Sequence, residues 1–159
     1  KTFKEITADL GVDVVSFGGT KNGLMIGEAV IFLNKTLAQD FKYIRKQSCQ
    51  LPSKSRFIAC QFLAYFKNNL WQEIAQNSLH RARELYDAVK AVPHVEIRSE
   101  PQSNAVFAII PSTWVKPLRD KHFFYVWDEN TFECRWMTSW DTQKEDIESF
   151  AQAIKELSK

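Results

Sequence analysis

Glycine is scarce in this chain of 159 residues. It occurs five times, always within residues 11–27, so backbone that can turn sharply or approach a ligand closely is confined to one segment. In that segment Lys21 stands between two apolar runs, residues 12–17 and 29–33, which we expect to form buried strands. A lysine amine placed this way can attack a carbonyl carbon. A lysine in an ordinary hairpin turn faces water instead, and the pattern alone does not separate the two hypotheses.

Cysteine and histidine are also few, with three of each. Cys49, Cys60 and Cys134 are odd in number and far apart, which argues against a disulfide framework and against a zinc site. The histidines are equally scattered. We therefore expect no metal, and a reducing compartment such as the cytoplasm.

The chain lacks an excess of charge of either sign and lacks long apolar runs. Its formal net charge is +2, and its basic residues are scattered, which disfavours a nucleic-acid-binding domain. No run is long enough to span a bilayer, and the first residues do not resemble a signal peptide, so we expect no membrane association. With 45% hydrophobic and 25% charged residues, the composition is typical of a folded, soluble domain.

Helical spacing dominates the middle of the chain. Asn34 is expected to cap a helix that continues through residue 44. Apolar residues then recur at helical spacing over residues 57–66 and 74–89, with Asn68-Asn69 as an interruption. Such stripes are typical of core or subunit contacts.

Shorter apolar segments follow Pro93. We expect strands at residues 95–98, 105–110, 123–127 and 132–137, with a helix at 112–121 between them. Thr142 and Glu145 have the spacing of a capping box ahead of a final amphipathic helix. This order predicts a small α/β layer.

Three segments carry a resemblance to a known family. Residues 13–23 (DVVSFGGTKNG) with 27–30 (GEAV) resemble the cofactor-lysine segment of the threonine aldolases, which are β-eliminating lyases of the fold-type-I group of enzymes that use pyridoxal 5′-phosphate (PLP). Residues 46–57 and 135–140 (RWMTSW) agree with it. The resemblance implies an α/β fold, with the end of a large PLP-binding domain at 1–50, connecting helices at 51–91 and a small α/β C-terminal domain at 92–159.

The resemblance also implies site residues. Lys21 would bind PLP as an imine, and Thr20 and Arg56 would contact its phosphate. Arg135 would pair with the substrate's α-carboxylate, since a guanidinium fork matches both oxygens. Residue alternation places Phe132, Cys134 and Trp136 on the opposite strand face from Arg135.

Ordinary explanations exist for three of these residues. Turn packing explains Thr20, and an ordinary capped helix start explains Arg56. The hydroxyls and two cations of residues 53–56 would instead form an anion site with the free backbone amides of a helix start. Pairing with Glu133 or with solvent explains Arg135.

A complete family member is roughly twice as long as this chain. We therefore expect a missing N-terminal half of the subunit, weak PLP binding by this fragment alone, and a homodimer or homotetramer. The implied activity is cleavage of a β-hydroxy-α-amino acid such as L-threonine to glycine and an aldehyde. PLP-dependent β-elimination from an amino acid, or a non-catalytic interaction module built on the long apolar helices, are the alternatives.

Overall fold

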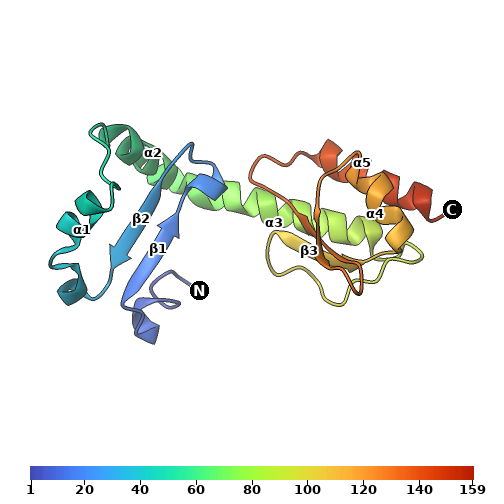
Figure 1. The fold of residues 1–159 in the computed structure, drawn as a ribbon, viewed down its shortest axis with the longest axis horizontal. Helices are drawn as coiled ribbons and strands as arrows, with labels where there is room; N and C mark the ends of the chain where they lie inside the picture. The colour runs from blue at the N-terminus through green and yellow to red at the C-terminus, as the bar shows by residue number, and fades with distance from the viewer. The chain divides into compact units, whose positions relative to one another are not determined.

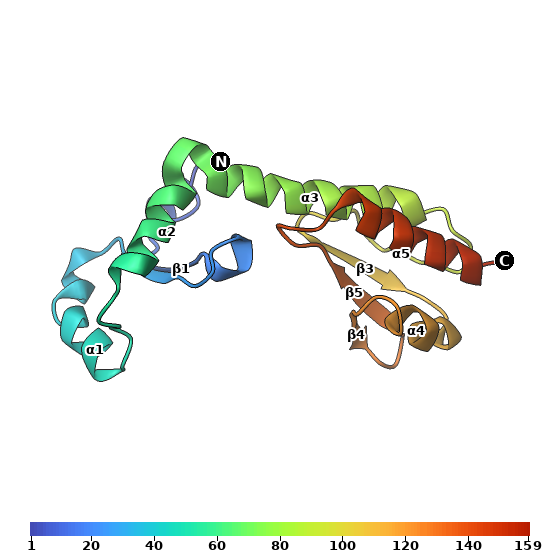
Figure 2. The same cartoon turned by 90° about the horizontal axis from the view of Figure 1, so that it is seen from above.

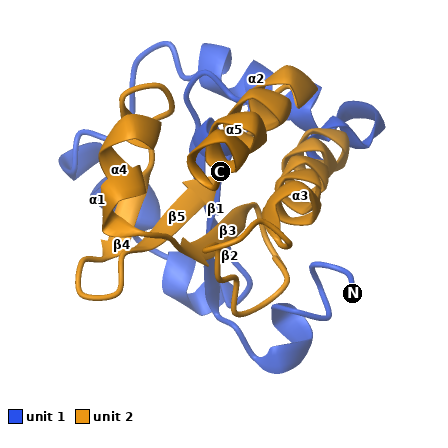
Figure 3. Cartoon of the chain, turned by 90° about the vertical axis from the view of Figure 1, so that its right-hand side faces the viewer, with its two compact units in different colours: residues 1–71 blue, residues 72–159 orange.

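The computed structural model describes residues 1–159, which form two compact units, Lys1–Trp71 and Gln72–Lys159 (Figure 3). The division into 1–50, 51–91 and 92–159 remains a prediction.

Unit 1 is built on a β-hairpin (Figure 1). Strands β1 (Val14–Gly18) and β2 (Glu28–Phe32) pair antiparallel, with Val14 opposite Phe32 and Gly18 opposite Glu28. The 3₁₀ turn η2 (Thr20–Asn22) lies in the connection. The two predicted strands are confirmed, and Lys21 lies between them as expected.

The expected burial of these strands is wrong for this chain. Side chains along β1 and β2 are half-buried or exposed, and Val30 and Ile31 keep 46% and 40% of their surface. Phe17 is covered by the rings of Phe3 and Phe66, at centroid distances of 5.9 and 5.7 Å. A two-stranded sheet has few neighbours, so unit 1 does not cover both of its faces.

The helix expected after Asn34 is two separate helices. Asn34 caps only η3 (Lys35–Ala38), where its side chain accepts from the Thr36 amide at 3.2 Å. Its side-chain amide also donates to Asp13 at 2.9 Å, which holds the cap against the start of β1. The helix α1 (Phe41–Gln47) then begins separately. The bond between Asn34 and Asp13 joins residues 21 positions apart in sequence, so local periodicity does not reveal it.

The predicted interruption at Asn68-Asn69 is confirmed. Helix α2 (Arg56–Phe66) ends in the turn η4 (Lys67–Asn69), where Asn68 and Asn69 have positive φ values of 55° and 59°. Asparagine tolerates this left-handed conformation better than most residues. Helix α3 (Leu70–Val89) follows, and none of the helices combines the length and apolar character needed to cross a membrane.

Unit 2 is an antiparallel sheet covered by helices on one face (Figures 2 and 3). Its strand order is β3-β5-β4. The elements are β3 (Ala105–Ile109), α4 (Ser112–Arg119), β4 (Tyr125–Asp128), β5 (Glu133–Met137) and α5 (Lys144–Leu157), together with α3. The strand expected at residues 95–98 is wrong, because only a single bridge from Glu96 to Ile109 forms there.

The hydrophobic core lies between this sheet and its helices. Alternation along the strands turns Val106, Ala108, Cys134 and Trp136 toward α3, α4 and α5, and all four are at most 2% exposed. Burial raises the pKa of the Cys134 thiol to about 11. Unit 1, in contrast, buries only Leu24 and Tyr65 among its larger apolar side chains.

The expected capping box of the last helix is displaced by one residue. Gln143 is the N-cap of α5, and the Asp146 carboxylate accepts from the Gln143 amide at 2.9 Å. Thr142 is not the cap because its hydroxyl accepts from the Ser139 amide at 2.8 Å in the preceding turn.

Candidate functional site

Lys21 is presented by a short turn at the end of the hairpin. It lies in η2, directly after β1 and the buried Gly19, and its side chain is exposed. No hydrogen bond or ion pair engages its Nζ within unit 1. The structure of unit 1 thus shows the ordinary alternative for this segment, a hairpin turn whose lysine faces water, and the amine is accessible at this end of unit 1.

The turn that carries Lys21 is held firmly on both sides. Gly19 donates to the Gly27 carbonyl at 2.9 Å, which closes the base of the loop. Beyond Lys21, the Asn22 side chain donates to the Tyr65 hydroxyl and to the Trp71 carbonyl, the latter at 3.2 Å.

Helix α2 supports the same loop. The Gln61 side-chain oxygen accepts from the Met25 and Ile26 amides at 3.0 and 3.3 Å. These partners lie 35 or more residues away in sequence, so no local pattern predicts them. These hydrogen bonds hold the backbone of the loop that carries Lys21.

The Thr20 hydroxyl belongs to the structure of the turn. It accepts from the Gly27 amide at 2.9 Å and lies 3.4 Å from the Gly27 carbonyl. The turn-packing explanation of Thr20 is thus observed. A contact between Thr20 and a phosphate remains a prediction.

Gly19 has no room for a side chain. A Cβ placed there would lie 1.8 Å from Cδ1 of Leu24, one of the few buried side chains of unit 1. We therefore expect Gly19→Ala to lower the free energy of unfolding by about 1–3 kcal/mol, measured by urea denaturation of unit 1 signals.

Gly18→Ala is the matched control for Gly19→Ala. The added Cβ would meet only the Glu28 carboxylate, the flexible end of an exposed side chain. We expect the free energy of unfolding of this variant to change by no more than about 0.5 kcal/mol. Equal losses in both variants would show that the contact with Leu24 does not fix the loop.

Arg56 is the first residue of α2 and is exposed. The expectation of free amides at this helix start is wrong. The amides of Phe57 and Ile58 already donate to the carbonyls of Lys54 and Ser55, each at 3.0 Å, and Ser55 makes no side-chain cap. An anion here would depend on the guanidinium of Arg56 itself. Its assignment to a cofactor phosphate stays a prediction.

Arg135 occupies the middle of the central strand β5. Its backbone pairs with Phe107 on one side and Tyr125 on the other. Cys134 and Trp136 point into the core, so the predicted alternation is confirmed for them. It is wrong for Phe132, which precedes the strand, has a φ of 56° and is 37% exposed.

The Arg135 side chain lies against two aromatic rings. Its guanidinium carbon is 4.8 Å from the centre of the Trp127 ring and 5.6 Å from that of Tyr125. Its Nε is buried without a hydrogen-bond partner, and no ion pair joins it to Glu133. Tyr125 and Trp127 lie on the same face of the predicted strand, but their contact with Arg135 was not predicted.

The four predicted site residues are divided between the units. Thr20, Lys21 and Arg56 belong to unit 1, where the first two share one turn, and Arg135 belongs to unit 2. The Thr20 hydroxyl bonds to Gly27 in its own turn and not to Arg56.

Two sequence relatives and one solved structure are similar to most of the chain. No protein-family model matches it. It is 35% identical over 151 residues to the low specificity L-threonine aldolase of a Pseudomonas species, strain NCIMB 10558, and 36% identical to that of Pseudomonas aeruginosa. Each alignment covers 95% of this chain and 44% of the relative.

A solved structure of the threonine aldolase from Leishmania major matches 93% of this chain and 44% of its own, with a TM-score of 0.85 and 28% sequence identity. The chain is similar to threonine aldolases over nearly its whole length. It spans less than half the length of those it matches. The predicted resemblance and the α/β fold class are confirmed.

Proposed function

We propose that this chain supplies the cofactor lysine and the carboxylate-binding arginine of a PLP-dependent threonine aldolase. The observation that carries the proposal is the accessible amine of Lys21 on a fixed loop. The 35% and 36% identity to two low specificity L-threonine aldolases supports the same reaction.

The residues around Lys21 fit the aldehyde end of PLP. The Nζ is exposed and unpaired, so it is able to bond to the carbonyl carbon. The Thr20 hydroxyl and the Arg56 guanidinium are the groups we assign to the phosphate. When bound, the cofactor withdraws electrons from the substrate's Cα, which permits cleavage of the bond to Cβ.

Arg135 would bind the substrate's α-carboxylate. Its guanidinium has no acidic partner in the chain. Because its Nε is buried, the two terminal nitrogens are the donors we assign to a two-pronged contact with both oxygens. Holding the carboxylate fixes the rotation about Cα and so selects the bond that breaks. L-threonine would then give glycine and acetaldehyde.

The exposed apolar surface of unit 1 supports the proposal that the active subunit contains an additional polypeptide segment and forms a homo-oligomer. Large apolar side chains are exposed on it, among them Leu10 at 74%, Met25 at 88% and Leu63 at 75%. An apolar hollow of about 360 Å³ lies over the hairpin, lined by Phe3, Val15, Phe17, Ile31, Leu33 and Phe66. Three free cysteines are compatible with a cytoplasmic location, which we also propose.

A chimeric aldolase tests the proposed function. It consists of the Pseudomonas aeruginosa relative with its matching segment of 151 residues replaced by this chain. We expect glycine and acetaldehyde from L-threonine in the presence of PLP. A folded chimera that is inactive on threonine would contradict the proposal, and release of a leaving group from serine or tryptophan would favour β-elimination instead.

A further inference from the structure

On the open face of the unit 2 sheet, aromatic side chains surround Arg135. The opposite face packs on the helices, whereas Phe107, Tyr125, Trp127 and Met137 lie on the side of Arg135 and are 37% to 58% exposed. Phe107 and Tyr125 flank Arg135 in the strand register. The Trp127 ring contacts Phe107 edge-on at 5.7 Å, which fixes its plane.

No acidic side chain holds Arg135 on this face. Arg81, whose Nε is also buried, pairs with Glu84 at 2.5 Å, and the exposed Arg83 pairs with Glu100 at 2.6 Å. Arg135 lacks such a partner and instead lies over Trp127 at 4.8 Å and Tyr125 at 5.6 Å. Both distances are within the range of a cation–π contact.

A carboxylate partner and an aromatic partner would affect ligand binding by Arg135 differently. A carboxylate partner would occupy the N–H donors of the guanidinium, and a ligand would have to displace that carboxylate. Aromatic faces attract the positive charge and leave the N–H groups in the guanidinium plane unused. The arrangement therefore orients Arg135 and leaves the N–H groups of its two terminal nitrogens without a partner in the chain, while Nε itself is buried.

We propose that Trp127, with Tyr125 beside it, is a positioning residue that holds the Arg135 guanidinium for a ligand carboxylate. This inference rests on the proposed function for the identity of the ligand. The contact itself is a property of the chain and is measured without any activity.

The first test uses the 159-residue chain and NMR. The Arg135 Nε–H resonance, identified by its loss in Arg135→Lys, is expected to be shifted by the ring currents and to exchange slowly with solvent. Trp127→Leu should move it toward the other arginine resonances and speed its exchange. Trp127→Phe should keep most of the shift, because an aromatic face remains.

Trp140→Leu is the matched control for Trp127→Leu. Trp140 is another exposed tryptophan of unit 2, at 43%, and it lies in a turn outside the sheet. The rings that contact the Arg135 guanidinium are those of Tyr125 and Trp127. The control should leave the Arg135 resonance in place. An unmoved resonance in a folded Trp127→Leu chain would overturn the contact whether or not the chain belongs to an aldolase.

The second test measures kinetics in the chimeric aldolase. Trp127→Leu should raise the KM for L-threonine about tenfold and change kcat much less, with Trp127→Phe near the original value. A moved NMR resonance with an unchanged KM would overturn the positioning role. A chimera inactive before any substitution would contradict the proposed function, and the NMR result would still decide the contact.

Discussion

Replacing Lys21 with alanine is expected to lower threonine cleavage by the chimeric aldolase by at least about 1,000-fold, because no other amine replaces the lost nucleophile. The free energy of unfolding should change little, since the Lys21 side chain is exposed and unpaired in unit 1. Glycine formation with saturating PLP is the measurement, and urea denaturation confirms that the variant is folded.

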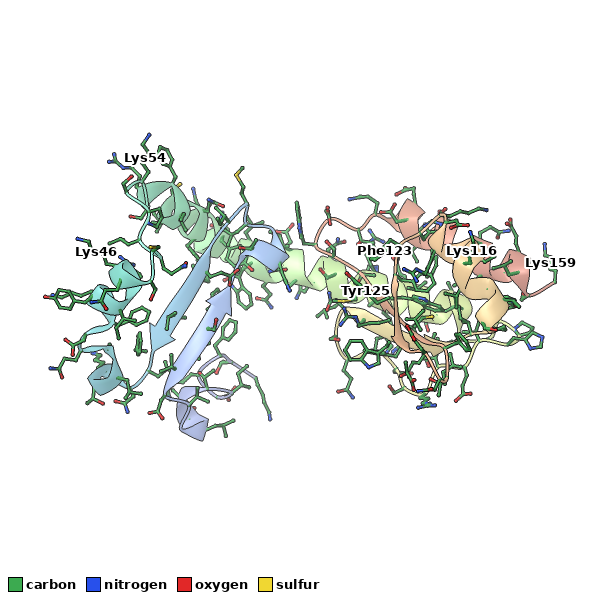
Figure 4. All side chains as sticks on the ribbon, in the orientation of Figure 1. Lys46, Lys54, Lys116, Phe123, Tyr125 and Lys159 are labelled. Atoms are coloured by element: carbon green, nitrogen blue, oxygen red, sulfur yellow. The ribbon has the colours of Figure 1, made fainter.

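Two further variants make the Lys21 prediction specific. Lys21→Arg keeps the positive charge and removes the nucleophile, so it should be as inactive as Lys21→Ala. Lys46→Ala removes another exposed lysine of unit 1 and should retain full activity (Figure 4). An active Lys21→Arg variant would show that Lys21 acts only through its charge.

Arg135→Leu is expected to lower kcat/KM for L-threonine on the order of 100-fold. The substitution removes the charged donors and leaves a substrate carboxylate without partners, a loss of about 3 kcal/mol. Arg135→Lys should have an intermediate kcat/KM, about tenfold below that of the unsubstituted chimera, because an ammonium keeps the charge but lacks the planar pair of donors.

The control for Arg135→Leu is Arg98→Leu. Arg98 is an exposed arginine of unit 2 that pairs loosely with Glu96 at 3.6 Å. Its loss should leave kcat/KM unchanged. Equal effects in the two variants would indicate a general electrostatic influence of unit 2 rather than a carboxylate site.

Periodicity predicted the order of elements well, because each strong pattern reports the burial of one face. The two strands that flank Lys21, the helices α2 and α3 with their asparagine break, and the strands β3, β4 and β5 all followed from it. The shift of the α5 cap to Gln143 did not, since a neighbouring turn engages the hydroxyl of Thr142. Such competition between two local partners has no signature in spacing.

The residues of the candidate site could be predicted from the sequence. The contacts that hold them in place could not. Lys21 and Arg135 were singled out by glycine clustering, strand alternation and family resemblance. The bonds from Asn22 to Tyr65 and Trp71 join segments more than 40 residues apart in sequence, so no window of sequence reveals them. The aromatic contacts of Arg135 depend likewise on the pairing of β4 with β5.

The most direct measurement of the central claim is the attachment site of PLP in the chimeric aldolase. Borohydride reduction followed by peptide mapping should find the fixed cofactor on Lys21 at one label per chain, with exposed lysines such as Lys46 unlabelled. A label spread evenly over exposed lysines, or one that persists at full yield in Lys21→Ala, would contradict the account.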